Sequence, residues 1–179
     1  MIELLTVIGI LVIVSGIIIG ILSTTLRGSE KTKITTSVAQ NGNYALSVIT
    51  NAILSSYAVT GIGNATSTSN PPFADCTSSP VAQSISLKST TGEEITFACA
   101  NDTIASNGAS IVDTSQVKID TSSTSTCSFK CIQPANNPYD IPIVEISFTV
   151  SDKKESGAFL ENKSSGIFKT SVSLRNFNP

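Results

Sequence analysis

The segment from Met1 to Leu22 is apolar almost throughout. Only Glu3, Thr6 and Ser15 interrupt this run with polar side chains, and Glu3 is its only charged residue. A helix of this length rises about 33 Å, which is enough to cross the hydrocarbon core of a bilayer. The pattern therefore predicts a hydrophobic helix half, residues 1–24, that can span a membrane.

A helical pattern continues beyond this run in amphipathic form. After a charged cluster at residues 27–33, apolar residues recur at steps of three and four, which places them on one face. The glycines of segment 61–63 end the pattern. We expect one helix over about residues 1–57, roughly 85 Å long. Its amphipathic half lies in a segment assigned to residues 25–60, up to the glycines, and packs on a domain. Its apolar positions are Ile34, Val38, Ala45, Val48, Ile49, Ala52, Ile53 and Tyr57.

Residues 61–179 are expected to form a β-rich globular head. Gly61–Pro80 is rich in Gly, Ser, Thr, Asn and Pro and predicts a loop between helix and sheet. Turns are expected at Thr91-Gly92 and Ser106-Asn107-Gly108. A meander of four to six antiparallel strands would cover the apolar face of the helix, which predicts an α+β fold. The strand-like segments are Ser84–Lys88, Glu94–Cys99, Ile111–Ile119, Thr126–Ile132, Ile141–Val150 and Gly166–Arg175.

Composition narrows the classes of function. The chain has 179 residues, 13% of them charged, and a net charge of −2, which gives no electrostatic argument for binding nucleic acid. The absence of histidine removes the commonest general base and metal ligand. No phosphate-binding loop, dinucleotide motif or calcium loop occurs. We therefore expect neither an enzyme nor a cofactor.

The four cysteines, Cys76, Cys99, Cys127 and Cys131, favour two disulfides in an exported chain. In an extended segment, Cys127 and Cys131 would lie on one face about 13 Å apart, too far to bond each other. This favours bonding Cys76 and Cys99 each to one of them. A tight turn at residues 128–130 would instead allow bridges from Cys127 to Cys131 and from Cys76 to Cys99. A four-cysteine zinc site is a weaker alternative, because no C-x-x-C pair is present.

The carboxylate of Glu3 needs a partner from outside its own segment, because an acid within an apolar run is costly. The I-E-L-L sequence at residues 2–5 and the apolar run from Val7 onward resemble the N-terminal segment of type IV pilins and pseudopilins. In that family a leader peptidase cleaves before an aromatic residue and methylates the new N-terminus, and the acid lies four positions later. Glu3 lies two positions after Met1. The resemblance thus implies a chain two residues short of a mature pilin and without its leader.

Gly16 and Gly20 admit two interpretations. Their spacing fits the small-xxx-small pattern of close helix packing, which would keep the helix continuous. Each glycine also costs about 1 kcal/mol relative to alanine within a helix, so the segment is a weak point. In many assembled pilins this region loses its helical hydrogen bonds. The resemblance therefore implies local unwinding here in a filament.

Three segments match the N-glycosylation pattern, beginning at Asn64, Asn101 and Asn162. The run Thr121–Thr126 is an equally plausible site of O-glycans. Such matches arise easily by chance in a chain so rich in Asn, Ser and Thr.

The resemblance implies a structural subunit of a type IV pilus-like surface filament that polymerises through its hydrophobic helix. Its partners would be other copies of itself in a helical homopolymer, the pilus assembly machinery, the leader peptidase and, before assembly, the inner membrane. Such filaments serve adhesion, twitching motility and DNA uptake. The nearest alternative is a pseudopilin of a type II secretion or competence apparatus. A monomeric membrane-anchored binding module is an alternative of another class.

The charged cluster at residues 27–33 conflicts with this orientation. The positive-inside rule would place these charges in the cytoplasm, whereas the pilin resemblance places them outside. The resemblance is preferred, because the orienting charges of a pilin lie in its leader.

Overall fold

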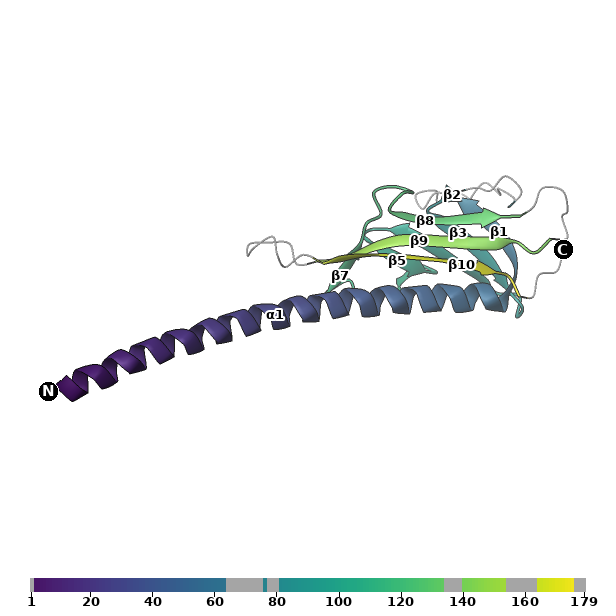
Figure 1. Ribbon diagram of the computed structural model, residues 1–179. Coiled ribbons are helices and arrows are strands. Elements are labelled where there is room, and N and C mark those ends of the chain that lie inside the picture. Colours follow the sequence, from purple (N-terminus) through teal and green to yellow (C-terminus); the bar gives the residue numbers. More distant parts are fainter. Residues whose placement is uncertain (1, 64–75, 77–80, 134–139, 154–163, 176–179) are drawn as a thin grey trace.

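The structure is a computed structural model that describes residues 2–63, 76, 81–133, 140–153 and 164–175. One helix, α1 (Ile2–Ser55), has 54 residues. Its N-terminal half projects from a β-rich head, and its C-terminal half lies along that head (Figure 1). The fold is therefore α+β, with antiparallel sheets packed on the second half of a long helix, as the hydrophobic pattern predicts.

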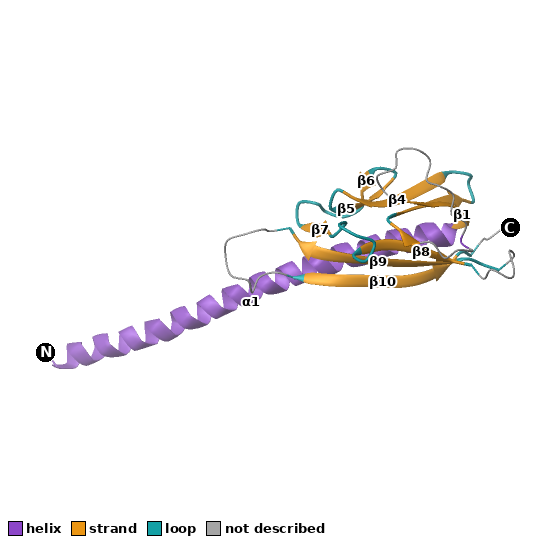
Figure 2. Cartoon of the chain, turned by 90° about the horizontal axis from the view of Figure 1, so that it is seen from above, coloured by secondary structure: helices purple, strands orange, loops and turns teal. Residues whose placement is uncertain are grey.

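The head contains two five-stranded antiparallel sheets. The first has the order β1-β3-β4-β5-β6, and the second has the order β10-β9-β8-β2, with β7 also paired to β9. In the view from above, the two sheets lie on either side of the line of α1 (Figure 2). The strands are β1 (Ser56–Gly63), β2 (Val81–Ala82), β3 (Ser84–Ser89), β4 (Glu94–Ala100), β5 (Thr103–Ser106), β6 (Ala109–Ser110), β7 (Val117–Ile119), β8 (Cys127–Ile132), β9 (Ile143–Asp152) and β10 (Ser165–Ser173).

The expected single meander is wrong, because two sheets share the core. The alternating strands β4 and β8 both direct their buried residues inward, including Phe97 and Phe129, so each sheet covers the apolar face of the other. Burial of two inner faces removes far more apolar surface from water than one sheet on one helix could. Hydrophobic alternation along each strand cannot say which strands pair.

The helix ends close to the expected position and is followed directly by a strand that the sequence did not predict. The helix stops at Ser55, and β1 begins at Ser56. This strand runs to Gly63, although a loop was expected from Gly61 onward. Strand β1 pairs with β3 over Ser56–Gly63 with two register irregularities. The glycines of segment 61–63 therefore lie in an irregular strand, as glycine often does at bulges.

The expected strand Ile111–Ile119 is also mostly wrong. Only Val117–Ile119 is extended, as β7, while Asp113 begins a turn closed by the N–H groups of Gln116 and Val117. Strands β5 and β6 precede it and were not predicted. The two expected turns are confirmed, since Gly92, Asn107 and Gly108 have positive φ angles of 88°, 49° and 85°.

Helix α1 packs on the head through a narrow stripe of small and β-branched residues. The stripe makes most of its contacts with β10 and β9. Packing on the head begins near Val38 rather than at residue 25, because residues 25–33 are exposed. The buried residues of the stripe are Val38, Gly42, Ala45, Ile49 and Ile53.

Gly42 allows the closest approach between the helix and the sheet. The Phe168 ring of β10 lies over it and stacks on Phe148 of β9, with ring centroids 5.6 Å apart and planes inclined by 17°. A Cβ atom placed on Gly42 would meet Phe168 ring carbons at 2.2–2.5 Å. Glycine is therefore required at this position by packing, whatever its cost in helix propensity.

Gly42→Ala should lower the stability of the head. The added methyl group forces the Phe168 ring off the helix, which costs about 1–3 kcal/mol and outweighs the gain of about 1 kcal/mol in helix propensity. Urea unfolding of the full chain in detergent measures the change. Gly28→Ala is the matched control, because nothing lies within 4 Å of its added Cβ. If Gly42→Ala unfolded at the same urea concentration as the unchanged chain, the ring contact would not hold the helix.

Candidate assembly helix

The N-terminal half of α1 is apolar on every side and lies outside the head. The large aliphatic side chains between Ile2 and Leu22 are 45–78% exposed. Of the described helices, α1 is long and apolar enough to cross a membrane, and none of its most apolar 18-residue window is buried. So large an exposed apolar surface requires lipid or protein around it. A long apolar helix near the N-terminus is consistent with a pilin-like segment.

Glu3 lies in the first turn of this exposed helix. Its backbone carbonyl accepts a hydrogen bond of 2.8 Å from the Thr6 hydroxyl. Its carboxylate has no hydrogen bond or ion pair with any described residue. The Thr6 hydroxyl already has a hydrogen-bond partner within the helix. The Glu3 carboxylate, the charged group of the apolar segment, has none there and needs one if it is buried. The structure thus leaves the predicted need for an outside partner in place.

Gly16 and Gly20 lie within an unbroken helix in this single chain. An added Cβ at either position would meet nothing within 4 Å. Thr24 bonds back to the carbonyls of Gly20 and Ile21, at 3.2 and 2.9 Å. Both interpretations, close packing and unwinding, concern the assembled filament, in which other helices surround these glycines.

A polar clamp holds the helix where it leaves the head. We use this name for Ser37, Asn41, Asp113, Gln116 and Lys153. The Asp113 N–H donates to Asn41 Oδ1 at 2.9 Å, and Asn41 Nδ2 donates to the Ser37 carbonyl at 3.0 Å. Ser37 Oγ donates to Gln116 Oε1 at 2.8 Å, and Gln116 Nε2 donates to Asp113 Oδ2 at 2.8 Å. The Lys153 N–H donates to the Gln116 carbonyl at 3.0 Å.

The carboxylate of Asp113 organises the head side of this clamp. It accepts hydrogen bonds from the hydroxyl and the N–H of Ser115, at 2.6 and 2.9 Å. These bonds, the hydroxyl first, lower the pKa of Asp113 below its ordinary value of 3.8. The pKa of Asp113 is therefore lower in the folded chain than in the unfolded chain. Its hydrogen bonds contribute stability at any pH above the unfolded pKa, and this stability is lost only as pH falls through the folded pKa. The Asp113 carboxylate is therefore ionised at neutral pH and accepts these hydrogen bonds.

Two disulfides staple the head. Cys99 of β4 bonds Cys127 of β8 and so joins the two sheets, while Cys76 bonds Cys131 at the other end of β8. This is one of the two arrangements in which Cys127 and Cys131 do not bond each other. The reason is the one inferred from spacing, since β8 is extended and both cysteines are buried on its inner face. The described residues contain no group of acidic or cysteine side chains able to hold a metal ion.

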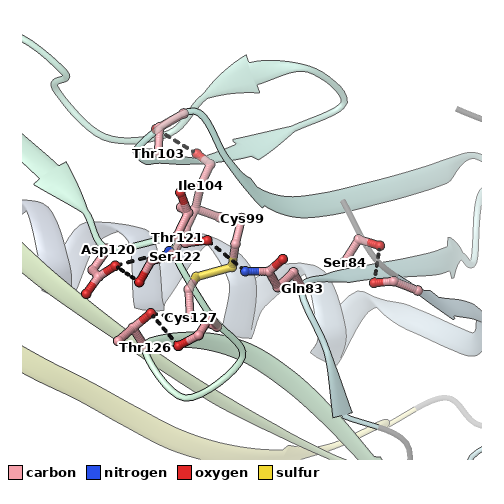
Figure 3. Close-up of a disulfide and its surroundings, with 12 residues drawn as sticks. Gln83, Ser84, Cys99, Thr103, Ile104, Asp120, Thr121, Ser122, Thr126 and Cys127 are labelled. Carbon is pink, nitrogen blue, oxygen red and sulfur yellow. Dashed lines mark hydrogen bonds between the residues drawn. A yellow bond between two sulfur atoms is a disulfide. The ribbon is translucent and has the colours of Figure 1, made fainter. Parts of the chain in front are cut away.

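The surroundings of the inter-sheet disulfide are tied together by polar contacts (Figure 3). Next to the bridge, Gln83 Nε2 donates to the Thr121 carbonyl at 2.8 Å. The adjacent Asp120 carboxylate accepts from the N–H and hydroxyl of Ser122, at 3.1 and 2.7 Å. These bonds fix the 120–126 turn beside β3, so the Ser/Thr-rich run is an ordered part of the head.

Of the three glycosylation matches, only Asn101 lies among the described residues. It is exposed in the turn between β4 and β5 and has a φ angle of 52°. Asn64 and Asn162 lie outside the described residues. Comparison of the chain with protein-family models, curated proteins and solved structures finds no match.

Sequence reasoning missed the residues that anchor the helix to the head. Asn41 and Gly42 were passed over within the helical pattern, although an adjacent Asn-Gly pair in a long helix is unfavourable and can signal a packing requirement. Phe168 and the 113–116 turn carried no such signal. Their roles depend on where β10 and β7 lie relative to α1.

Proposed function

We propose that this chain is a structural subunit of a type IV pilus-like extracellular filament. The hydrophobic halves of the helices bundle in the filament core, and the disulfide-stapled heads form its outside. One observation carries the proposal: an apolar helix half, exposed on every side, projects from a folded head and contains a single carboxylate near its end. Further copies of the same chain would cover the apolar surface and supply a partner for the acid.

Three further features support the proposal. The I-E-L-L segment at residues 2–5 resembles the start of mature pilins. Residues 37–55 of the helix are fixed to the head, so this part of the helix and the head move as one unit. Two buried disulfides suit a protein that must stay folded outside the cell.

The same proposal assigns partners and location. Before assembly, residues 2–22 lie in the inner membrane, and the chain then passes to the pilus assembly machinery. The leader peptidase would act on a precursor of this chain. In the filament the partners are other copies of the chain, and the product lies on the cell surface with roles in adhesion, motility or DNA uptake.

Electron microscopy of filaments sheared from cells tests this function, with the chain identified by mass spectrometry. Long filaments made of this chain are expected. Short fibres in place of long, abundant surface filaments would favour the pseudopilin alternative. A chain that stays in the membrane fraction and purifies from detergent as a monomer would contradict polymerisation and favour a membrane-anchored binding module.

The helix should be locally unwound near Gly16 and Gly20 in the filament. The two glycines lower helix propensity by about 2 kcal/mol relative to two alanines. Freed backbone groups are tolerated where protein rather than lipid surrounds them. Extended residues rise about 3.3 Å instead of 1.5 Å, so unwinding also lengthens the segment and lets the filament stretch.

A filament map at side-chain resolution decides between unwinding and close packing. Missing helical hydrogen bonds between Val12 and Ser23 are expected. An unbroken backbone ladder across these residues would show instead that the glycines serve close helix packing.

A further inference from the structure

Residues 23–36 connect the apolar half of α1 to the part held by the head, and we call this segment the stalk. Within it only Ile34 is half-buried, while the other side chains are exposed. At a rise of about 1.5 Å per residue, the stalk is about 21 Å long. It therefore forms a stretch of helix that neither the apolar run nor the head stabilises by packing.

The sequence of the stalk forms helix poorly. More than half of its residues are Ser, Thr or Gly, all of which have lower helix propensity than alanine. Its threonine hydroxyls bond back to the helix's own carbonyls, at 2.8 Å from Thr25 to Ile21 and at 3.0 Å from Thr32 to Gly28. Such bonds compete for the carbonyls of the helix ladder and weaken or bend it. Gly28 lies in the middle with open space around it.

The segments on both sides of the stalk are stabilised. On its C-terminal side, Val38 is 3% exposed, and the polar clamp fixes Ser37 and Asn41 to the head. On its N-terminal side, residues 2–22 are apolar, and in lipid their backbone can satisfy its hydrogen bonds only as a helix. In water, an isolated helix as short as the stalk is marginal even with a favourable sequence.

We propose that the stalk is a hinge of the unassembled, membrane-anchored subunit. Its helix opens locally, so the head and the membrane half take different relative orientations, while the clamp sets the boundary of the movement on the head side. The hinge rests on the proposed function in placing residues 2–22 in a membrane. It differs in position and state from unwinding at Gly16–Gly20, which concerns the filament.

Amide hydrogen exchange of the full chain in lipid nanodiscs, followed by mass spectrometry, tests the hinge. Local opening exposes amides that stable helix protects. Amides of residues 24–33 should exchange on the order of 100-fold faster than those of residues 45–53 and residues 6–20. If the amides of residues 24–33 exchanged less than about tenfold faster than those of either flanking segment, the hinge would be overturned. That outcome includes fast exchange of residues 6–20, which would also contradict the membrane placement.

A variant with four alanine substitutions in the stalk, called the stiffened variant, tests whether the sequence of the stalk, and not only its exposure to solvent, causes the fast exchange. Its stalk should exchange at least about tenfold more slowly than that of the unchanged chain. The control carries the same number of alanines on the exposed face of the head-bound half and should leave stalk exchange unchanged. Equal stalk exchange in all three chains would overturn a hinge built from these residues. The stiffened variant carries Thr24→Ala, Thr25→Ala, Gly28→Ala and Thr32→Ala, and the control carries Gln40→Ala, Asn43→Ala, Ser47→Ala and Asn51→Ala.

The result is independent of the filament assay. Exchange is measured on unassembled chains, so a mobile stalk in a chain that forms no filaments would sustain the hinge and contradict the filament function. A protected stalk in a chain that forms filaments would contradict the hinge and support the filament function.

Discussion

Glu3→Ala should abolish filaments while leaving the head folded and the amount of chain in the membrane unchanged. In the proposed bundle the carboxylate lies in an apolar core, where the N-terminal amine of a neighbouring subunit is its natural complement. At the low effective dielectric of such a core, an ion pair gains several kcal/mol before its desolvation cost is subtracted. Removing one member leaves the other charge buried and unpaired, which typically costs about 3–5 kcal/mol. Counting filaments sheared from equal numbers of cells measures the effect.

Two matched variants separate charge from packing. Glu3→Gln keeps the shape of the side chain without its charge and should fail as completely as Glu3→Ala. Thr6→Ala removes a nearby hydroxyl that bonds to a carbonyl of its own helix, so filament numbers should be unchanged. Normal numbers of filaments from Glu3→Ala would contradict the proposed role of this acid.

Removing either disulfide should destabilise the head by about 3–4 kcal/mol. The bridges close segments with sequence separations of 28 and 55 residues, and in the chain-entropy account longer closed loops are stabilised more. All four cysteines are buried, none of them more than 6% exposed, which limits the access of reductants to the bridges in the folded head. Urea unfolding of the double variants Cys99→Ala with Cys127→Ala, and Cys76→Ala with Cys131→Ala, measures each bridge.

The redox state of the cysteines provides the control. Alkylation of the unreduced, mature protein followed by mass spectrometry should label no cysteine. The masses of proteolytic fragments should show Cys99 linked to Cys127 and Cys76 linked to Cys131. Four freely labelled thiols, or unfolding unchanged by loss of both bridges, would contradict a stapling role.

The local features of this chain follow from its sequence. The apolar run from Met1 to Leu22 has few alternatives to helix in an apolar environment, so the projecting half of α1 could be predicted without tertiary information. The spacing of Val38, Ala45, Ile49 and Ile53 likewise predicted the buried face, since helix periodicity is a local property. Strands β8 and β9 were recognisable from strict alternation.

The tertiary structure decided what depends on pairing between distant segments. Ser56–Gly63 is a strand only because β3 supplies its hydrogen bonds, and alternation within a strand cannot specify its neighbour. Two sheets form instead of one because their inner faces bury each other, with Cys99 and Cys127 brought together from opposite sides. The need for glycine at Gly42 arises from the ring of Phe168, which lies far along the chain in the last strand. Local propensity determines which segments can be helix or strand, whereas burial shared between distant segments determines how they are joined.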